Sequence, residues 1–196
     1  MTSFEAKAAA RGYQKICGLD EVGRGPLAGP VMAAAVILPR GCLIPGLRDS
    51  KKLTPLQRER FYDHITEVAL SIGIGTVENE TIDEINIYQA TLLAMQQALK
   101  VLKTKPDYLL IDALRLPNID IPQEGIIRGD NLSISIAAAS VIAKVTRDRL
   151  MIRYHADFPE YQFHRHKGYG TREHFEKIKE YGPCPLHRKS FRGVIC

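Results

Sequence analysis

The chain has 196 residues, of which 45% are hydrophobic and 25% are charged, a balance that is typical of a folded globular protein and excludes an intrinsically disordered one. The formal net charge of +5 is a mild basic excess, which suggests an acidic partner such as nucleic acid without requiring one. Because no signal-peptide pattern opens the chain and no apolar run is long enough to cross a bilayer, we expect a cytoplasmic protein without a membrane partner.

The N-terminal half of the chain predicts three strands and two helices. Apolar runs at 14–22 and 30–39 flank a Gly/Pro turn, which favours an antiparallel pair, and 70–78 is expected to supply a third strand. The stretch Thr54-Pro55-Leu56-Gln57 is a capping box with proline at the first helical position, so it predicts a helix over 55–68. A second capping box, at 81–84, predicts a long helix that reaches about residue 103.

The C-terminal half alternates strands with helices. A buried strand over 108–111 stops at Asp112, and a weaker strand over 125–128 stops just before Asp130. Helical patterns follow at 133–155, where small residues are frequent, and at 171–181. This order predicts an α/β fold with one mixed sheet flanked by helices. We assign residues 1–156 to this domain and 157–196 to a small helical, basic C-terminal extension packed on it.

Acidic residues stand at the ends of three predicted strands, namely Asp20 with Glu21, Asp112, and Asp130. In an open α/β sheet, the ends of the central strands share one crevice. Two ionised carboxylates about 5 Å apart repel by about 3 kcal/mol at an effective dielectric constant near 20, so a cluster of four needs cations. Oxygen-only ligands favour Mg²⁺ or Mn²⁺. Any one of these acids alone is more typical of a strand-end cap or a solvated side chain, but the set indicates a metal site.

Two other chemistries are disfavoured by the sequence. Gly23, Gly25 and Gly29 follow a strand as in a dinucleotide-binding loop, but their spacing is G-x-G-x-x-x-G and the next element is a strand, so the required context is missing. The four cysteines form no C-x-x-C pair, and we expect reduced thiols without disulfides.

Six motifs in chain order resemble the bacterial type 2 ribonucleases H, the ribonuclease HII family. They are DEVGRGPLAGPV (20–31), DSKKL (49–53), LLIDAL (109–114), IIRGD (126–130), AAASVIAKVTRDR (137–149) and HKGYGT (166–171). The segment HRKSF (187–191) also resembles the basic C-terminal segment of that family. The resemblance implies a ribonuclease H-like fold and hydrolysis of the RNA strand in RNA–DNA hybrids. It also implies nicking 5′ of single ribonucleotides embedded in duplex DNA, which leaves 3′-hydroxyl and 5′-phosphate ends.

The same resemblance assigns site residues. The catalytic, metal-binding acids of the family fall on the four acids already selected by charge, which are Asp20, Glu21, Asp112 and Asp130. The resemblance also implies two ions of Mn²⁺ or Mg²⁺ during catalysis. The Gly-Arg-Gly motif falls on Gly23, Arg24 and Gly25, and the junction-sensing tyrosine on Tyr169. Discrimination between RNA and DNA must use the 2′-hydroxyl, and glycines let the backbone approach a sugar closely.

Four further residues are predicted to contact the nucleic-acid backbone. Ser50 and Lys51 form a flexible turn before the helix at 55–68, and Lys144 and Arg147 lie on one stripe of the helix at 133–155. A solvated helix face explains the stripe equally well, but its position beside the acids favours phosphate contact.

Two alternative functions stay open at this point. One is a metal-dependent nuclease of the same fold that acts on another DNA substrate, such as a junction, although the Gly-Arg-Gly loop and Tyr169 disfavour it. The other is a non-catalytic nucleic-acid-binding module, which the four acids disfavour because they weaken phosphate binding unless metals occupy them. We expect a monomer that binds RNA–DNA hybrids and ribonucleotide-containing duplex DNA.

Overall fold

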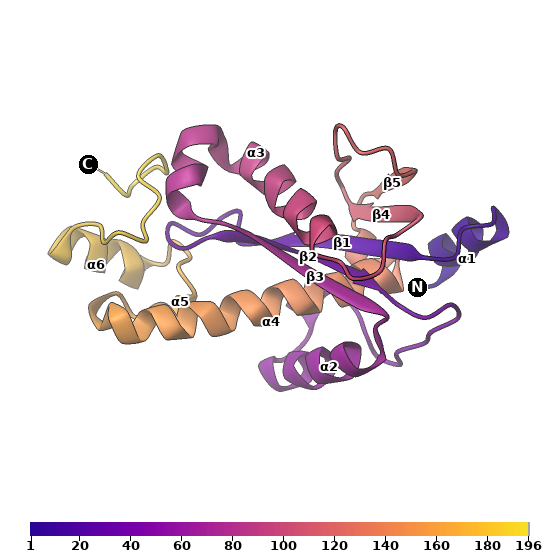
Figure 1. Ribbon diagram of the computed structural model, residues 1–196. Coiled ribbons are helices and arrows are strands. Elements are labelled where there is room, and N and C mark those ends of the chain that lie inside the picture. The colour runs from indigo at the N-terminus through magenta and orange to yellow at the C-terminus, as the bar shows by residue number, and fades with distance from the viewer. Residues whose placement is uncertain (196) are drawn as a thin grey trace.

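The computed structural model describes residues 1–195, and a five-stranded mixed sheet forms its centre (Figure 1). The strands β1 and β2 pair in antiparallel fashion, as do β2 and β3, whereas β1–β4 and β4–β5 are parallel pairs. The spatial order is β3 (Ser71–Val77), β2 (Val31–Ile37), β1 (Ile16–Val22), β4 (Tyr108–Asp112) and β5 (Gln123–Ile126). The predicted α/β fold with a mixed sheet is therefore confirmed, and β1, which carries two of the predicted acids, lies in the middle of the sheet.

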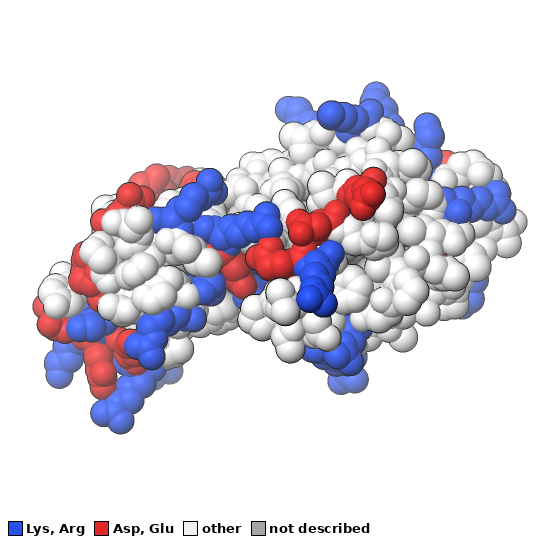
Figure 2. Space-filling model, turned by 90° about the horizontal axis from the view of Figure 1, so that it is seen from below, with Lys and Arg blue, Asp and Glu red and all other residues white. Residues whose placement is uncertain are grey.

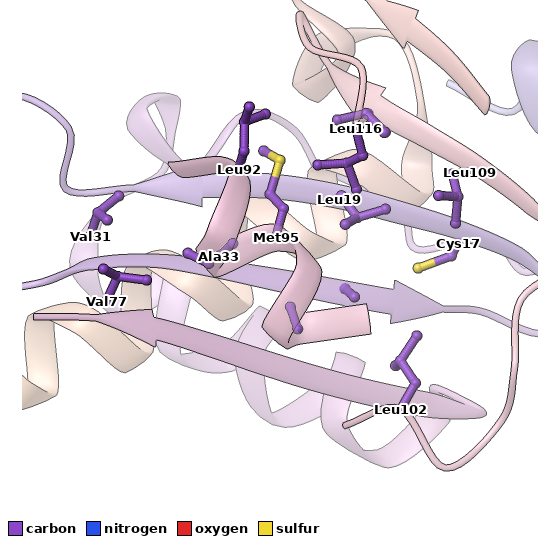
Figure 3. Packing of buried hydrophobic residues seen from close by; sticks show 14 of the residues in the cluster. Cys17, Leu19, Val31, Ala33, Val77, Leu92, Met95, Leu102, Leu109 and Leu116 are labelled. Atoms are coloured by element: carbon purple, nitrogen blue, oxygen red, sulfur yellow. The ribbon is translucent and has the colours of Figure 1, made fainter. Parts of the chain in front are cut away.

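Helices cover both faces of this sheet. The helix α3 (Asn79–Lys100) lies on one face, and α2 (Pro55–Val68) and α4 (Ile134–Asp157) lie on the other (Figure 1). All seven residues of β2 are buried, because alternate side chains enter the two cores. In one core, Leu92 and Met95 of α3 lie over Leu19 of β1 (Figure 3).

Glycines allow the helices to approach the sheet closely. A Cβ atom on Gly18 would lie 2.1 Å from the backbone carbonyl carbon of Ser135 in α4, and one on Gly75 would lie 1.9 Å from the carbonyl oxygen of Ala94 in α3. Any side chain at these two positions would push a helix away from the sheet.

The predicted helix starts are confirmed where a side chain caps the first turn. Both hydrogen bonds of the capping box form at the start of α2, between Thr54 and Gln57. Ser133 caps α4 by accepting a hydrogen bond from the backbone N–H of Ile136. The last predicted helix is α6 (Arg172–Tyr181), which Thr171 caps in the same way.

The second predicted capping box is wrong. The helix α3 begins at Asn79, and it is kinked at Asn86, whose φ of 67° is not helical. The Asn86 carboxamide oxygen accepts hydrogen bonds from the backbone N–H groups of Tyr88 and Gln89, so Asn86, and not Thr81, caps the longer part of the helix.

The end of β5 also differs from the prediction, because the strand stops at Ile126. Arg128 adopts a left-handed conformation with a φ of 58°, and it leads into the 3₁₀ turn η2 (Gly129–Asn131). Asp130 therefore stands on a short turn after the strand and not directly at the strand end.

Several short elements carry no signal that predicted them, namely α1 (Ser3–Ala10), η1 (Ser50–Lys52), η3 (Pro159–Tyr161) and α5 (Phe163–His166). Among the described residues, Cys17, Cys42 and Cys184 are free thiols, and Cys196 lies outside that range. None of the helices within residues 1–195 combines the length and apolarity that crossing a membrane requires. The boundary at residue 156 stays a prediction.

Candidate metal and nucleic-acid site

The four predicted acids come together at one end of the central strands. The strands β1 and β4 are parallel, with Leu19 opposite Ile111, so the next residues along them are Asp20 and Asp112. Neighbouring strands are about 4.8 Å apart, which places these two side by side. Asp130 lies on η2. This turn is held next to Asp112 because the backbone N–H of Gly129 donates a hydrogen bond of 2.7 Å to Oδ1 of Asp112.

Burial and mutual repulsion disfavour ionisation in this cluster. Burial raises the pKa of Asp20 well above its ordinary value, and the charges of Glu21 and Asp112 raise it further. Burial also raises the pKa of Glu21, although the Arg24 guanidinium opposes this effect. Burial and neighbouring carboxylates raise the pKa of Asp130. A cation among these groups would reverse the sign of the local field and favour their charged forms.

One buried oxygen of the cluster has no partner, which tests whether a metal fits here. Oε2 of Glu21 is buried and accepts no hydrogen bond from the described residues, while Oε1 lies 3.4 Å from Nη1 of Arg24. A buried carboxylate oxygen without a donor is costly, and a bound cation would satisfy it. The oxygen-only donor set fits Mg²⁺ or Mn²⁺.

The carboxylates are gathered but do not yet enclose an ion. Within residues 1–195, no three Asp, Glu, His or Cys side chains are arranged so that they could hold a metal together. Asp20 is only 6% exposed, so the more accessible members of the cluster have more freedom to move.

The Gly-Arg-Gly loop and the tyrosine loop meet beside the acids. Arg24 forms an ion pair with Glu21, and the backbone N–H of Leu27 donates a hydrogen bond of 2.8 Å to the carbonyl of Gly168. A Cβ atom on Gly25 would have only one neighbouring residue within 4 Å, which is Tyr169 at 3.9 Å. The space at Gly25 is thus open and is bordered by the aromatic ring of Tyr169. Tyr169 is 40% exposed.

Lys51 and Lys144 lie at the border of this site. Burial alone would lower the pKa of Lys51, but nearby carboxylates, with Asp20 the strongest, raise it overall, so the ammonium faces the acids. Nζ of Lys144 lies 5.8 Å from the centroid of the Tyr169 ring and 2.7 Å from Oδ1 of Asp148. Lys51 thus lies beside the acids, and Lys144 lies beside the ring of Tyr169.

Two of the predicted phosphate contacts disagree with the structure. Ser50 is buried, and its hydroxyl lies 2.8 Å from the hydroxyl of Ser140 and not at the surface. Arg147 is 0% exposed, and its guanidinium donates hydrogen bonds to three backbone carbonyls. The stripe on α4 did not reveal this burial, because the helix is covered by β1 and β2 on one side and by the loops around residues 28 and 167 on another.

Three buried residues that the sequence analysis did not select hold these loops. Arg188 is 0% exposed and donates to the carbonyl of Gly23 at 2.6 Å. Nδ1 of His174 donates to the carbonyl of Tyr169 at 2.9 Å, and its Nε2 lies 3.0 Å from Nε2 of His187. Burial lowers the pKa of both histidines to about 4, so they are neutral at neutral pH. The segment HRKSF, which contains His187 and Arg188, was the sequence signal that could have pointed to these two residues.

Charged side chains are dense at the end of the molecule that carries α5 and α6, and sparser over the opposite end (Figure 2). The site lies between the sheet and this charged end. A mixed sheet with an acidic cluster at the ends of its central strands, next to basic loops, is the arrangement of a ribonuclease H-like protein with a candidate metal site.

The comparisons with known proteins specify the class further. The sequence model of the family Ribonuclease HII matches residues 17–194. A ribonuclease HII of Geotalea uraniireducens is 55% identical over 194 residues, which are 99% of this chain and 90% of the relative. The chain belongs to the ribonuclease HII family. It is therefore a divalent-metal-dependent endoribonuclease that acts on RNA–DNA hybrids.

Solved structures share the fold. The crystal structure of ribonuclease H2 from Pyrococcus horikoshii OT3 matches with a TM-score of 0.78 at 25% identity, covering 92% of this chain and 95% of that one. Bst-RNase HIII, solved in complex with Mn²⁺, matches with a TM-score of 0.67 at 19% identity, covering 92% and 68%. The ribonuclease H-like fold expected from the sequence is thus confirmed.

Proposed function

We propose that this enzyme nicks duplex DNA on the 5′ side of a single embedded ribonucleotide and leaves 3′-hydroxyl and 5′-phosphate ends. The observation that carries the proposal is the open space at Gly25, which lies between the exposed ring of Tyr169 and the loop residue Arg24 that pairs with Glu21. A sugar could approach the backbone there while its phosphate lies near the acids.

The four acids hold the catalytic metal in this proposal. Asp20 and Asp112, which are neighbours on β1 and β4, would hold two Mg²⁺ or Mn²⁺ ions together with Glu21 and Asp130. Such ions would supply the Lewis acidity that activates water and neutralises charge at the leaving 3′-oxygen. The unpartnered Oε2 of Glu21 and the raised pKa values of Asp20, Glu21 and Asp130 support this assignment.

The loop and the tyrosine select the ribonucleotide. A 2′-hydroxyl both donates and accepts hydrogen bonds, so backbone N–H and C=O groups can recognise it where no side chain intervenes. Gly25 supplies such a position, and Tyr169 stacks on the adjacent sugar. A plain tight turn would also explain the glycines, since Gly23 has a φ of 89°, but it would not explain the exposed ring next to Gly25.

Lys51 and Lys144 bind phosphates beside the site. We also expect the protein to be a cytoplasmic monomer whose catalytic domain spans residues 1–156. The extension after residue 156 serves the same site, because His187 forms an isolated β-bridge with Ala28. Gel filtration at several protein concentrations checks the oligomeric state.

A duplex with one ribonucleotide, incubated with Mg²⁺ or Mn²⁺, tests the function. The nick position and both end groups are mapped, and an all-DNA duplex and a DNA junction of the same sequence serve as controls. Asp112→Asn should lose nearly all turnover and keep most of its affinity for the duplex. Cleavage of the all-DNA controls at a similar rate would favour the alternative DNA nuclease instead.

A further inference from the structure

Two buried arginines surround the loop at 23–30. Arg147 of α4 donates to the carbonyls of Pro30 at 3.0 Å, Ala28 at 3.1 Å and Lys167 at 2.9 Å. Arg188, which follows α6, donates to three carbonyls of the same loop, those of Gly29 at 2.9 Å, Arg24 at 3.1 Å and Gly23 at 2.6 Å. We call Arg147 and Arg188 the arginine clamp.

The two guanidinium groups of the clamp are buried without forming an ion pair. Both residues are 0% exposed, and within residues 1–195 neither guanidinium lies within 4.0 Å of a carboxylate oxygen. Burying a charge is costly unless hydrogen bonds compensate for it. The compensation comes entirely from backbone carbonyls, five of which belong to the loop at 23–30.

Holding these carbonyls also orients the N–H groups of the loop. The carbonyls of Gly23 and Arg24 share their peptide units with the N–H groups of Arg24 and Gly25. All peptide bonds in the described chain are trans, so each of these N–H groups points away from the carbonyl that Arg188 holds. Neither N–H donates a hydrogen bond to any of the described residues, so two adjacent donors are available next to the open space at Gly25.

The clamp fixes the tyrosine loop to the same body. Arg147 holds the carbonyl of Lys167 with the guanidinium that also holds Ala28 and Pro30. The separation between the two donors at 24–25 and the Tyr169 ring therefore depends on this buried side chain together with the hydrogen bond from Leu27 to the carbonyl of Gly168.

We propose that Arg147 and Arg188 are positioning residues for ribonucleotide recognition, because they hold the free N–H groups of Arg24 and Gly25 and the Tyr169 loop in one fixed arrangement. Neither arginine touches the substrate. The proposal rests on the proposed function, since it assumes that this space receives the 2′-hydroxyl.

The test compares Arg188→Met, which removes all three hydrogen bonds, with Arg188→Lys, which keeps the charge and some donors. Arg172→Met is the matched control, because the Arg172 side chain is 93% exposed and pairs with Glu176. We expect Arg188→Met to lower kcat/KM on the single-ribonucleotide duplex on the order of 10-fold to 100-fold, as misplacement of a binding group does. We also expect it to reduce the preference in affinity for that duplex over all-DNA duplex.

Arg188→Lys should recover part of both losses, and the control should match the wild type. Mn²⁺ affinity, measured by calorimetry without nucleic acid, should stay unchanged in all three variants, which a general loss of structure would not allow. A folded Arg188→Met enzyme with the wild-type preference for the ribonucleotide duplex would overturn the proposal.

If Arg188→Met does not fold, hydrogen exchange in Arg188→Lys decides, measured at the N–H groups of Leu27 and Gly29, which donate to the carbonyls of Gly168 and Leu186. Faster exchange with a reduced preference supports the clamp, whereas unchanged exchange and preference overturn it. A wild-type enzyme that fails to nick the single-ribonucleotide duplex refutes the proposed function instead. The clamp is then judged by the preference for RNA–DNA hybrid over all-DNA duplex.

Discussion

Replacing Asp20 by asparagine should inactivate the enzyme and, at the same time, stabilise its metal-free fold. Asp20 is 6% exposed, and burial and the charges of Glu21 and Asp112 raise its pKa. Asparagine keeps the size of the side chain and removes the charge. The same substitution removes a proposed metal ligand, so the gain in stability should come with a loss of metal binding.

The magnitude follows from the strand spacing. Carboxylates on neighbouring strands lie about 5 Å apart, and each ionised pair costs about 3 kcal/mol at an effective dielectric constant near 20. Protonation relieves part of this repulsion, so we expect Asp20→Asn to raise the free energy of unfolding by about 2 kcal/mol. For a chain of this length, that gain corresponds to a rise in Tm of about 4–8 °C.

The raised pKa of Asp20 also determines how the effect of Asp20→Asn on stability changes with pH. A carboxyl group with a higher pKa in the folded state binds its proton more tightly there. Its favourable contribution is therefore complete below the ordinary pKa of aspartate and is lost as the pH rises through the raised folded value. The stabilisation by Asp20→Asn should accordingly be larger near pH 8 than near pH 5.

Thermal unfolding of chelator-treated protein at both pH values, with and without Mn²⁺, measures these effects. Asp120→Asn is the control, because it makes the same chemical change at an exposed position. Added Mn²⁺ should raise the Tm of the wild type and of the control more than that of Asp20→Asn. An equal or lower Tm for metal-free Asp20→Asn near pH 8 would refute the repulsion argument.

Three further substitutions test the loops and the basic border. Gly23→Ala should destabilise the fold by about 1–3 kcal/mol in denaturant unfolding, because the φ of Gly23 is 89° and the new Cβ would lie 2.4 Å from Nε of Arg147. Gly25→Ala, in contrast, should leave stability nearly unchanged and reduce nicking at single ribonucleotides. Equal stability losses would contradict this contrast. Tyr169→Ala should weaken binding of the ribonucleotide duplex by about 1–3 kcal/mol in titrations, and Tyr169→Phe should bind normally if stacking is the contribution. Lys144→Ala should flatten the salt dependence of binding by a slope of about 1, and an unchanged slope would assign Lys144 to the solvated surface.

Local signals in the sequence predicted most of the fold. The capping box at Thr54 and Gln57 specified the start of α2 because both of its hydrogen bonds join residues three positions apart. Asp20 and Asp112 were selected correctly as neighbours because the ends of adjacent parallel strands meet at one edge of the sheet. The Thr81 signal failed because Asn86 offered a cap that breaks the helix there.

The sequence could not predict what holds the loop at 23–30 and the loop of Tyr169. Arg147 reaches Pro30 across 117 residues, and Arg188 reaches Gly23 across 165. A helical stripe tells which residues share a face, but not which face the distant loops cover. For this reason Arg147 was predicted as a phosphate contact, although it is fully buried.

The clamp also affects the order in which the enzyme matures during synthesis. The strands and helices that gather the four acids are complete at Asp157, but three of the five carbonyls of the loop at 23–30 that the clamp holds are held by Arg188. A nascent chain on the ribosome can therefore assemble its acidic cluster before the loop at 23–30 is fixed. Selectivity for the sugar would then be the last property that the newly made protein gains.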